Sequence, residues 1–595
     1  MKTGAIAFGA LIWAAPAVAQ QQDPLAPLPT SSSPIVQPPA SPPAAPAQIQ
    51  TTTPATQPAP PPAPLFAIPR DWRGVFDAID AGNWASARAG IAALPASVLA
   101  PVAKAELYTA KGSPVVDLAS LEALIAQSPE LPQADQLSAM AFGRGATTTP
   151  GYFQEKPTVN LGSAPVRYRA HPVQGEPVAD QLRAVLDPLV KADDAAGAEA
   201  QLLVYAPQLS AEARAEAATR VGFVYYVLGL DLDARRVADT WRQGAAGEWA
   251  SQAAWVSGLA SWRVGDCESA SRDFNQVAAL AQQRELRAGG LYWAARSEQV
   301  CQRPQSVTPL LRAAAADPES FYGLVARETL GIDTKLPADP FVGFDPPVDQ
   351  LPNVQRAIEL ARIGEPALAE EMLRHQAKIG LPTEHHALIQ LAKRIDLPAA
   401  QLWLANNGQP GARSDASDRY PNPHWNPLNG WRVDPALAFG HIVQESAFRR
   451  TAVSLAGAVG LMQVLPVTAQ MVSRNRGVPY TRAALTDPKY NLEYGQSFIE
   501  MMRGNPGTAG QLPRVIASYN AGPLPVARWA SINDKGDPLL WIESIPYWET
   551  RYYVPAVLRN MWVYQGLNSE DTTTLHAIAE HRWPTFPTSM TRLTH

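Results

Sequence analysis

The sequence predicts an all-α protein in which helical hairpins stack into a solenoid and a further helical unit follows. Between about residues 70 and 335, Ala, Leu, Arg and aromatic residues recur at the spacing of amphipathic helices. The same turn, a Gly followed by an acidic or small residue, separates apolar helices at several points, as expected for stacked hairpins. A chain of 595 residues is also too long for one hydrophobic core, so several structural units are expected.

The first 19 residues have the pattern of a cleaved secretory signal. Lys2 supplies the positive start, residues 6–13 form the apolar region, and residues 17–19 (Ala-Val-Ala) are a small-x-small cleavage site. The alternative, a membrane anchor, is disfavoured because the apolar run is short for crossing a bilayer. No other segment is predicted to span a membrane, so we expect the mature protein in the periplasm.

Residues 20–69 are rich in Pro, Ala, Thr, Ser and Gln and contain almost no aromatic residues. Such a segment cannot bury enough apolar surface to offset the entropy of ordering, so it is predicted to be a disordered tether. The formal net charge is −5 and no basic run is present, so the sequence indicates no nucleic-acid partner.

Four turns separate the predicted hairpins, at Gly82, Gly229, Gly265 and Gly364. In each turn Gly ends one helix, and an acidic or small residue opens its partner. We therefore predict an α-helical solenoid over residues 70–335. Several aromatic side chains are predicted to fill its core, with sugar stacking as the minor alternative: Tyr225, Tyr226, Trp241, Trp255, Trp262, Tyr292 and Trp293.

The chain contains two cysteines, Cys267 and Cys301. Cys267 lies near the start of one predicted helix and Cys301 directly after the next one ends, so antiparallel packing would bring them together. An oxidising compartment permits a bridge. A structural disulfide is therefore favoured over two free thiols.

Two segments interrupt the helical pattern. Residues 143–177 contain few helix formers and are predicted to form an extended excursion within the solenoid, with no assigned purpose. A link rich in Pro and Asp follows residue 335, and further predicted helices end at a polar loop. We therefore predict a helical linker domain over residues 336–419, a C-terminal domain over residues 420–585 and a tail over residues 586–595.

The C-terminal domain contains a carboxyl group in an apolar setting. Asp434 and Pro435 predict a helix start, because Asp caps free amides and Pro suits the first helical position. The helix is expected to continue to about Phe448, which places Glu445 late in it. A lone Glu is usually a solvated surface residue, but apolar neighbours would raise its pKa and keep it protonated, as a general acid requires. His441, one turn earlier, could face Glu445, but we expect it to be packed or exposed instead.

Four segments in chain order then carry a specific pattern. Residues 445–469 contain Glu-Ser-Ala-Phe, then Ser-Leu-Ala-Gly-Ala-Val-Gly-Leu-Met-Gln-Val-Leu-Pro, then Thr-Ala. Asp-Pro-x-x-Asn-Leu-Glu-Tyr-Gly follows at 487–495, Ala-Ser-Tyr-Asn-Ala-Gly at 517–522, and Ile-Pro-Tyr-Trp-Glu-Thr-Arg-Tyr-Tyr-Val at 545–554. Together they resemble the motifs of the soluble lytic transglycosylases of the lysozyme superfamily. Residues 320–331 resemble, more weakly, the ring-forming solenoid of the large members.

The resemblance implies a superhelical solenoid, whose closure into a ring the sequence leaves open, and a lysozyme-like α-helical catalytic domain. It implies that Glu445 is the sole acid/base. It also implies that Ser454 and Gln463 line the groove and contact the sugar, Ser454 near the N-acetyl group. Tyr519 would hold the catalytic carboxyl or the sugar by its hydroxyl. From the residues alone, Ser454 could equally form a turn and Tyr519 could be a core residue.

Further roles follow from the same resemblance. Asn520 would shape the site, Glu549 would lie near the groove, and Arg551 would anchor the last helix. The alternatives are a turn or cap for Asn520 and a structural ion pair of Arg551 with Glu549 or Glu543. Val443 stands where many relatives have Arg, a departure that concerns subsites rather than the reaction.

The implied reaction is non-hydrolytic cleavage of the β-1,4 bond between N-acetylmuramic acid and N-acetylglucosamine in peptidoglycan, which leaves 1,6-anhydro ends. Peptidoglycan strands are the implied partner, other cell-wall enzymes are further candidates, and no metal or organic cofactor is implied. One alternative is hydrolysis by the same acid, as in goose-type lysozyme, which product mass would reveal. The other is a non-catalytic glycan-binding scaffold, against which Glu445, Ser454, Gln463 and Tyr519 argue.

Overall fold

The computed structural model describes residues 66–336 and 345–587. The predicted signal, nearly all of the predicted tether and most of the predicted tail lie outside these ranges. Within them, helices account for all regular structure except two strands of two residues each, which confirms the expected all-α fold. Over the same ranges, no helix combines the length and the apolar composition that crossing a bilayer requires.

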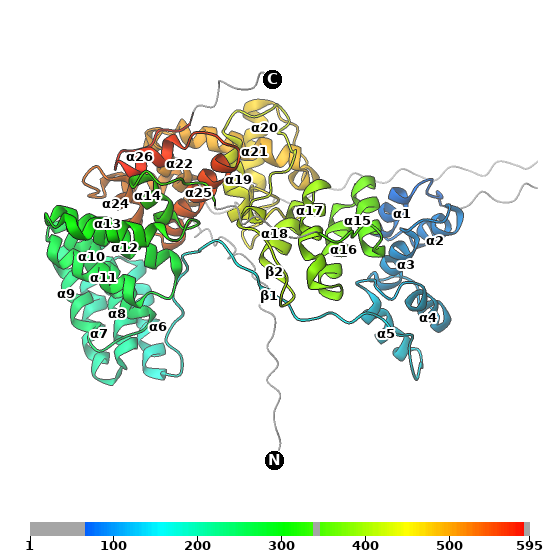
Figure 1. The fold of residues 1–595 in the computed structure, drawn as a ribbon, viewed down its shortest axis with the longest axis horizontal. Coiled ribbons are helices and arrows are strands. Elements are labelled where there is room, and N and C mark those ends of the chain that lie inside the picture. Colours follow the sequence, from blue (N-terminus) through cyan, green and yellow to red (C-terminus); the bar gives the residue numbers. More distant parts are fainter. Residues whose placement is uncertain (1–65, 337–344, 588–595) are drawn as a thin grey trace, which may run out of the picture. The chain divides into compact units, whose positions relative to one another are not determined.

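Packing divides the described residues into two compact units. One comprises residues 66–152 and 362–365, and the other comprises the remaining described residues, so the predicted solenoid range covers parts of both. In the first unit, Asp71 and Asp117 cap α1 and α4 by accepting hydrogen bonds from backbone amides. Its helices, in blue tones in Figure 1, are α1 (Trp72–Asp80), α2 (Trp84–Ala93), α3 (Ala100–Thr109), α4 (Leu118–Gln127) and α5 (Ala134–Gly143).

The second unit begins with a stack of helical hairpins. Its helices are α6 (Pro177–Lys191), α7 (Ala195–Tyr205), η1 (Ala206–Gln208), α8 (Ala211–Val227), α9 (Asp231–Trp241), α10 (Glu248–Val264), α11 (Cys267–Leu280), α12 (Arg284–Val300), α13 (Pro304–Ala315) and α14 (Phe321–Thr329). The turns form where predicted, because Gly229 and Gly265 have φ values of 77° and 85°, which Gly adopts without strain. Asp266 then caps α11 through its side chain.

The disulfide and the aromatic core of this stack agree with the predictions from the sequence. Cys267 at the start of α11 and Cys301 directly after α12 form a disulfide, which confirms the prediction. Five of the aromatic residues predicted to fill the core are buried: Tyr225, Tyr226, Trp255, Tyr292 and Trp293. Trp241 and Trp262 are partly buried and pack against the same core, so all seven contribute to packing.

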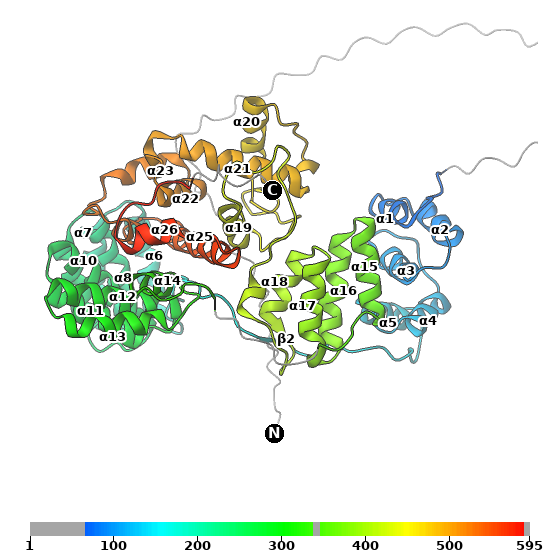
Figure 2. The same cartoon turned by 45° about the horizontal axis from the view of Figure 1, so that its top comes forward.

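Residues 153–176, which we call the strap, cross the second unit as an extended segment, drawn in cyan in Figures 1 and 2. Within the strap, β1 (Val159–Asn160) pairs in antiparallel orientation with β2 (Asn407–Gly408). The other strap residues belong to no strand. This agrees with the extended excursion predicted for residues 143–177.

The remaining helices of the second unit follow the strap and the hairpin stack. Those within the predicted linker range are α15 (Pro352–Ile363), α16 (Pro366–Ile379), η2 (Pro382–Glu384), α17 (His385–Arg394), α18 (Pro398–Asn406) and η3 (Ala416–Arg419). The C-terminal helices are α19 (Pro435–Glu445), α20 (Pro466–Arg476), η4 (Ala483–Thr486), α21 (Pro488–Arg503), η5 (Pro506–Thr508), α22 (Leu512–Ala521), α23 (Pro523–Arg528), η6 (Trp529–Ser531), α24 (Pro538–Glu543), α25 (Trp548–Leu567) and α26 (Thr573–Ala579). The long helix α25 contacts α14, α19 and α22.

Helix α14 joins the hairpin stack to the C-terminal helices. Phe321 stacks on Trp562 of α25, with ring centroids 5.3 Å apart. Tyr322 donates its hydroxyl hydrogen to Oε1 of Glu543 at 2.7 Å. All four side chains are buried. Residues 320–331, which carry the weaker resemblance, therefore form a contact between the solenoid and the domain that contains Glu445.

Candidate active site

Glu445 is the last residue of α19, and signals at both ends of the helix place it there. At the start, Asp434 accepts a hydrogen bond from the backbone N–H of Ala436 at 2.8 Å, as predicted. At the end, Ala447 and Phe448 adopt φ values of 50° and 64°, which turn the chain out of the helix. The predicted helix end at about Phe448 is therefore slightly too late, and Glu445 occupies the terminus itself.

Glu445 lies in the wall of a cavity of about 710 Å³. Burial raises the pKa of its carboxyl to about 8. A hydrogen bond from Tyr553 acts in the opposite direction, and the nearby Glu549 carboxyl adds to the increase. The carboxyl of Glu445 is therefore mainly protonated at neutral pH, in agreement with the raised pKa that its apolar neighbours predicted.

Glu445 is held by a tyrosine for which the sequence suggested no role. The hydroxyl of Tyr553 donates to Oε1 of Glu445 at 2.5 Å, and Nδ1 of His441 lies 2.6 Å from the same hydroxyl oxygen. His441 is buried, as the packed alternative predicts, and burial lowers its pKa to about 3, so its ring is neutral. The place of Tyr553 in the fourth motif was the only sequence signal for this contact.

The loop after α19 brings Ser454 and Gln463 to the same cavity. Asn491 of α21 shapes this loop, because its buried side-chain amide accepts the N–H of Met462 and donates to two backbone carbonyls. Gly460, with a φ of 82°, passes so close that an added Cβ would lie 2.4 Å from the Asn491 amide nitrogen. Gly460 of the first motif and Asn491 of the second motif therefore set the backbone conformation of this loop together.

The two predicted groove residues of this loop also make local hydrogen bonds. Ser454 accepts the backbone N–H of Ala458 at 3.0 Å, so it has the turn-forming role that was the alternative. The amide nitrogen of Gln463 donates to the carbonyl oxygens of Ala452 and Gly460 at 3.1 and 2.8 Å. Because both side chains also line the cavity, these bonds hold them in place there.

The prediction for Tyr519 is that its hydroxyl holds the catalytic carboxyl or the sugar, and the structure contradicts the first of these roles. Its hydroxyl donates to the backbone carbonyl of Met462 at 2.8 Å, and Tyr553 from α25 takes the place beside Glu445. The physical reason is that α25 packs along α19 and presents its own tyrosine to the end of that helix. Tyr519 supports the loop next to Gln463 instead.

Asn520 and Glu549 line the cavity with Glu445. The side-chain oxygen of Asn520 accepts the hydroxyl hydrogen of Thr550 at 2.6 Å, which ties α22 to α25. Burial raises the pKa of Glu549. The cavity therefore contains a second carboxyl group with a raised pKa.

The structure contradicts the alternative of an ion pair between Arg551 and Glu549 or Glu543. Within the described residues, Arg551 forms neither pair. The guanidinium of Arg551 lies 3.8 Å from the ring centroid of Phe223, in the hairpin stack. Glu543 pairs instead with Arg167 of the strap, with 2.7 Å between nitrogen and oxygen. The sequence could not predict this pairing, because the strap comes from a distant part of the chain.

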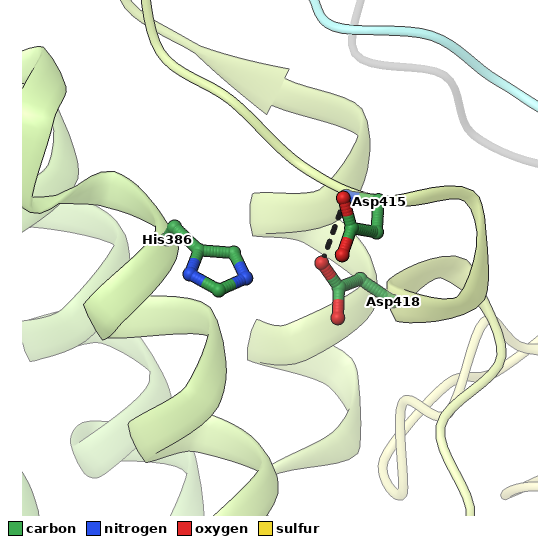
Figure 3. Close-up of side chains that lie close together, drawn as sticks. All are labelled: His386, Asp415 and Asp418. Atoms are coloured by element: carbon green, nitrogen blue, oxygen red, sulfur yellow. Dashed lines mark hydrogen bonds between the residues drawn. The ribbon is translucent and has the colours of Figure 1, made fainter. Parts of the chain in front are cut away.

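A second group of titratable side chains lies away from the cavity, between α17 and η3. His386, Asp415 and Asp418 have potential ligand atoms within 4.8 Å of one another, and Figure 3 shows the imidazole across from the two carboxylates. The backbone N–H of Asp415 donates to Oδ2 of Asp418 at 2.9 Å, and Nδ1 of His386 lies 2.9 Å from Asp345. The two carboxylates belong to the cap of η3 and the imidazole contacts Asp345, so we assign no metal to the group.

Residues 426–542 match the transglycosylase SLT domain family. This range holds α19 with Glu445, the loop with Ser454 and Gln463, and α22 with Tyr519. The fold and the site therefore define a chain that contains a transglycosylase SLT domain.

Similar proteins include soluble lytic murein transglycosylases. This chain is 29% identical over 273 residues to that of Escherichia coli and 30% identical over 254 residues to that of Salmonella typhimurium. The alignments cover 43% and 40% of this chain, and 40% and 38% of the two relatives. The chain thus spans less than half the length of these relatives, and the resemblance seen in its motifs is confirmed.

Two solved structures share the fold beyond the SLT domain. The lytic transglycosylase Slt of Pseudomonas aeruginosa, solved as an inactive mutant, aligns with a TM-score of 0.54 at 20% identity over 86% of this chain and 88% of that one. The 70 kDa soluble lytic transglycosylase of Escherichia coli aligns with a TM-score of 0.52 at 18% identity, over 87% of this chain and 98% of that one. At this level of identity the likeness concerns the fold, and it includes the helical stack before the SLT domain.

Proposed function

We propose that this chain is a peptidoglycan lytic transglycosylase, which cleaves the β-1,4 bond between N-acetylmuramic acid and N-acetylglucosamine without water. The observation that carries the proposal is the state of Glu445, a carboxyl with a pKa of about 8 that Tyr553 holds in the wall of a large cavity. A group of this kind can donate a proton to a glycosidic oxygen and then take one back. The relatives named lytic murein transglycosylases support the substrate class.

One carboxyl completes the proposed cycle. Glu445 protonates the oxygen that links C1 of the muramyl residue to N-acetylglucosamine, and the C1–O bond breaks. The carbonyl oxygen of the 2-acetamido group stabilises the positive charge at C1, as in substrate-assisted glycosidases. The Glu445 carboxylate then removes the proton of the C6 hydroxyl, and O6 bonds to C1 and closes the anhydro ring. Glu445 is protonated again at the end.

The C6 hydroxyl has an advantage over water because it belongs to the same sugar. Well-oriented intramolecular reactions can gain about 7–11 kcal/mol from the proximity of the reacting groups. The walls of the cavity, formed by α25, the loop after α19 and the strap, are where a bound strand would displace water.

The other predicted site residues receive supporting roles in this proposal. Ser454, Gln463, Asn520 and Glu549 contact the sugar, since all four line the cavity. Tyr519 is not part of the lining, and it supports the loop through Met462.

The main alternative is hydrolysis by the same acid. Most hydrolytic glycosidases use a second carboxylate as base or nucleophile. Glu549 shares the cavity, but burial raises its pKa and disfavours the ionised form that such a role requires. A passive scaffold is disfavoured too, because a buried carboxyl with a strongly raised pKa in a cavity is typical of catalysis.

Mass spectrometry of digested peptidoglycan sacculi tests the proposal. The expected products carry anhydromuramic ends, one water lighter than the products of hydrolysis. Glu445→Gln serves as the blank and should release neither product. Products with only reducing muramic ends would establish the hydrolase instead, and no release by the wild type would support the scaffold.

We also propose that the protein acts in the periplasm. The signal pattern of residues 1–19 supports this location, and so does the disulfide between Cys267 and Cys301, which suits an oxidising compartment. Cell fractionation should recover the protein outside the cytoplasm with residues 1–19 removed. An uncleaved protein in the cytoplasm would contradict the proposal.

A further inference from the structure

A separate cavity of about 370 Å³ lies where the hairpin stack meets the C-terminal helices, and we call it the junction cavity. The stack lines one side of it with Trp262, Gly265, Cys267, Arg296 and Val300. The other side is lined by residues 535–537, which form the turn before α24, and by His581, which follows α26. None of these residues lines the cavity around Glu445, so the proposed catalytic role accounts for none of them.

Arg296 of α12 is held in a fixed orientation at the junction cavity and is only 8% exposed. Its guanidinium lies 4.7 Å from the ring centroid of Trp262 and 4.4 Å from that of Trp293. Its Nη2 donates to Oδ2 of Asp537 at 2.6 Å. Its Nη1 is buried and has no hydrogen-bond partner among the described residues. The contacts of Arg296 therefore orient the side chain and leave one terminal nitrogen unsatisfied.

His581 brings a second unsatisfied nitrogen to the same cavity. Its Nδ1 is buried, and no hydrogen-bond partner for it lies in the part of the chain that the structure describes. Burial lowers the pKa of the ring to about 4, so His581 is neutral at neutral pH and can donate one N–H. Buried polar atoms without a partner are rare in folded proteins. Two of them in one cavity indicate a ligand that accepts hydrogen bonds.

Lys535 gives the junction cavity a positive charge. It is exposed, and within residues 66–336 and 345–587 no acid lies within ion-pair distance of it. Asp537, the acid that lines the cavity, is already paired with Arg296. The charge of Lys535 also acts on Asp231, but that acid is paired with Arg263. The positive charge at the cavity is therefore not balanced at neutral pH, and it attracts an anion.

The donors of the cavity suit a phosphate group better than a carboxylate. Arginine typically binds a carboxylate through two parallel hydrogen bonds, but Nη2 of Arg296 is already committed to Asp537. A phosphate group offers three strong acceptor oxygens. It can therefore accept hydrogen bonds from Nη1 of Arg296, Nδ1 of His581 and the ammonium of Lys535 together.

We propose that the junction cavity binds a phosphate group, held by Arg296, Lys535 and His581. Arg296 belongs to the hairpin stack and the other two residues belong to the C-terminal segment, so the bound phosphate ties these two parts of the chain together. Trp262 and Val300 provide an apolar surface beside the donors, which suits the carbon skeleton of a phosphate ester. This site is independent of the reaction proposed for Glu445.

Isothermal titration calorimetry with inorganic phosphate, on the full oxidised chain at constant ionic strength, tests the site. The wild type should show saturable binding. Lys535→Gln removes an exposed charge and should weaken the affinity about fivefold, the upper end of what an exposed ion pair contributes. Lys191→Gln, at an exposed lysine of α6 that does not line the cavity, is the matched control and should bind as the wild type does.

A second variant tests the buried donor. Arg296→Lys keeps a cation beside Asp537 but removes Nη1, so it should weaken phosphate binding by at least about tenfold, as expected for a hydrogen bond to a charged group. No saturable binding by the wild type would overturn the proposal. Binding that Lys535→Gln leaves unchanged would also overturn it, because the phosphate would then bind elsewhere. Since Lys535 is exposed, this second outcome decides even if Arg296→Lys does not fold.

The choice of ligand identifies what the site takes. Glycerol phosphate that binds more tightly than inorganic phosphate would identify an ester as the ligand, and the reverse would identify the free ion. Either result supports the site. Acetate is the carboxylate arm of the comparison and should bind more weakly than phosphate. Acetate that binds as tightly as phosphate would overturn the assignment to a phosphate group.

Thermal unfolding provides a readout of the tie between the two parts of the chain. A ligand that binds the folded state raises the unfolding midpoint, so phosphate should raise it more in the wild type than in Lys535→Gln. Phosphate also stabilises proteins in general because it is excluded from their surfaces. The shift of Lys191→Gln should equal that of the wild type. Equal shifts in all three proteins would show only the general effect and would contradict the site.

Discussion

Arg167 of the strap and Glu543 of α24 form a buried ion pair with 2.7 Å between nitrogen and oxygen, although 376 residues separate them in the sequence. The other oxygen of Glu543 accepts the hydroxyl hydrogen of Tyr322 from α14. The strap, the hairpin stack and the C-terminal helices therefore meet at one carboxylate. This contact fixes the strap wall of the cavity that contains Glu445.

Removal of one partner of this pair should be strongly destabilising. Arg167→Met leaves Glu543 charged, buried and without its cation, and a buried pair broken in this way typically costs about 3–5 kcal/mol. Denaturant unfolding measures the loss. The double variant Arg167→Met with Glu543→Gln should recover much of it, because no charge then remains buried. A double variant as unstable as the single one would contradict this account.

Glu445→Gln should abolish turnover and leave glycan binding intact. Gln cannot donate the proton, and loss of general acid–base catalysis typically costs 10²–10⁴-fold in rate. Release of soluble products from sacculi measures turnover, and a sedimentation assay measures glycan binding. Glu268→Gln, at a side chain that is 81% exposed, is the control and should behave as the wild type. Substantial turnover by Glu445→Gln would exclude Glu445 as the acid.

The stability of the protein should depend on the ionisation of Glu445. Its pKa is about 8 in the folded state against 4.5 for an unperturbed Glu, so the folded state binds the proton more tightly than the unfolded chain. The stabilisation is complete below the unfolded pKa and is lost as the pH rises through the folded one. Relative to wild type, Glu445→Gln should therefore gain on the order of 4 kcal/mol between about pH 4 and pH 9. If the unfolding free energies of both proteins follow the same pH profile, ionisation of Glu445 does not contribute to the pH dependence of stability.

The disulfide should contribute to the stability of the hairpin stack. Cys267 and Cys301 are 34 residues apart, and closing a loop of this length is expected to stabilise by about 3–4 kcal/mol in the chain-entropy model. Changing both to Ser should lower the unfolding free energy by that order, and a reducing agent should do the same to the wild type. The Ser variant should not respond to the reducing agent. A response in both proteins would mean that the agent acts elsewhere.

Local signals explain why much of the helical architecture could be predicted. Gly82, Gly229, Gly265 and Gly364 all adopt positive φ at the turns where they were expected. Asp434 caps α19 as predicted, because a side-chain acceptor next to free amides needs no tertiary partner. Each of these features depends on residues within a few positions along the chain.

The site was only partly predictable. The apolar neighbours of Glu445 indicated its raised pKa, and the motifs contain several of the residues that line the cavity, among them Ser454, Gln463 and Glu549. The contact between Tyr553 and Glu445, and the pairing of Glu543 with Arg167 instead of Arg551, were not predictable. Both contacts depend on which segments pack against each other in the folded protein. No local pattern in the sequence indicates that packing.

The sequence by itself determined the helices, their caps and turns, the disulfide partners and the acid in its apolar setting. These follow from backbone preferences and from burial, which act over short stretches of chain. Only the tertiary structure decided which tyrosine holds Glu445, which cation neutralises Glu543 and that the strap forms a wall of the cavity. The reason is that hydrogen bonds and ion pairs act over a few ångströms, so their partners are settled only when distant segments pack together.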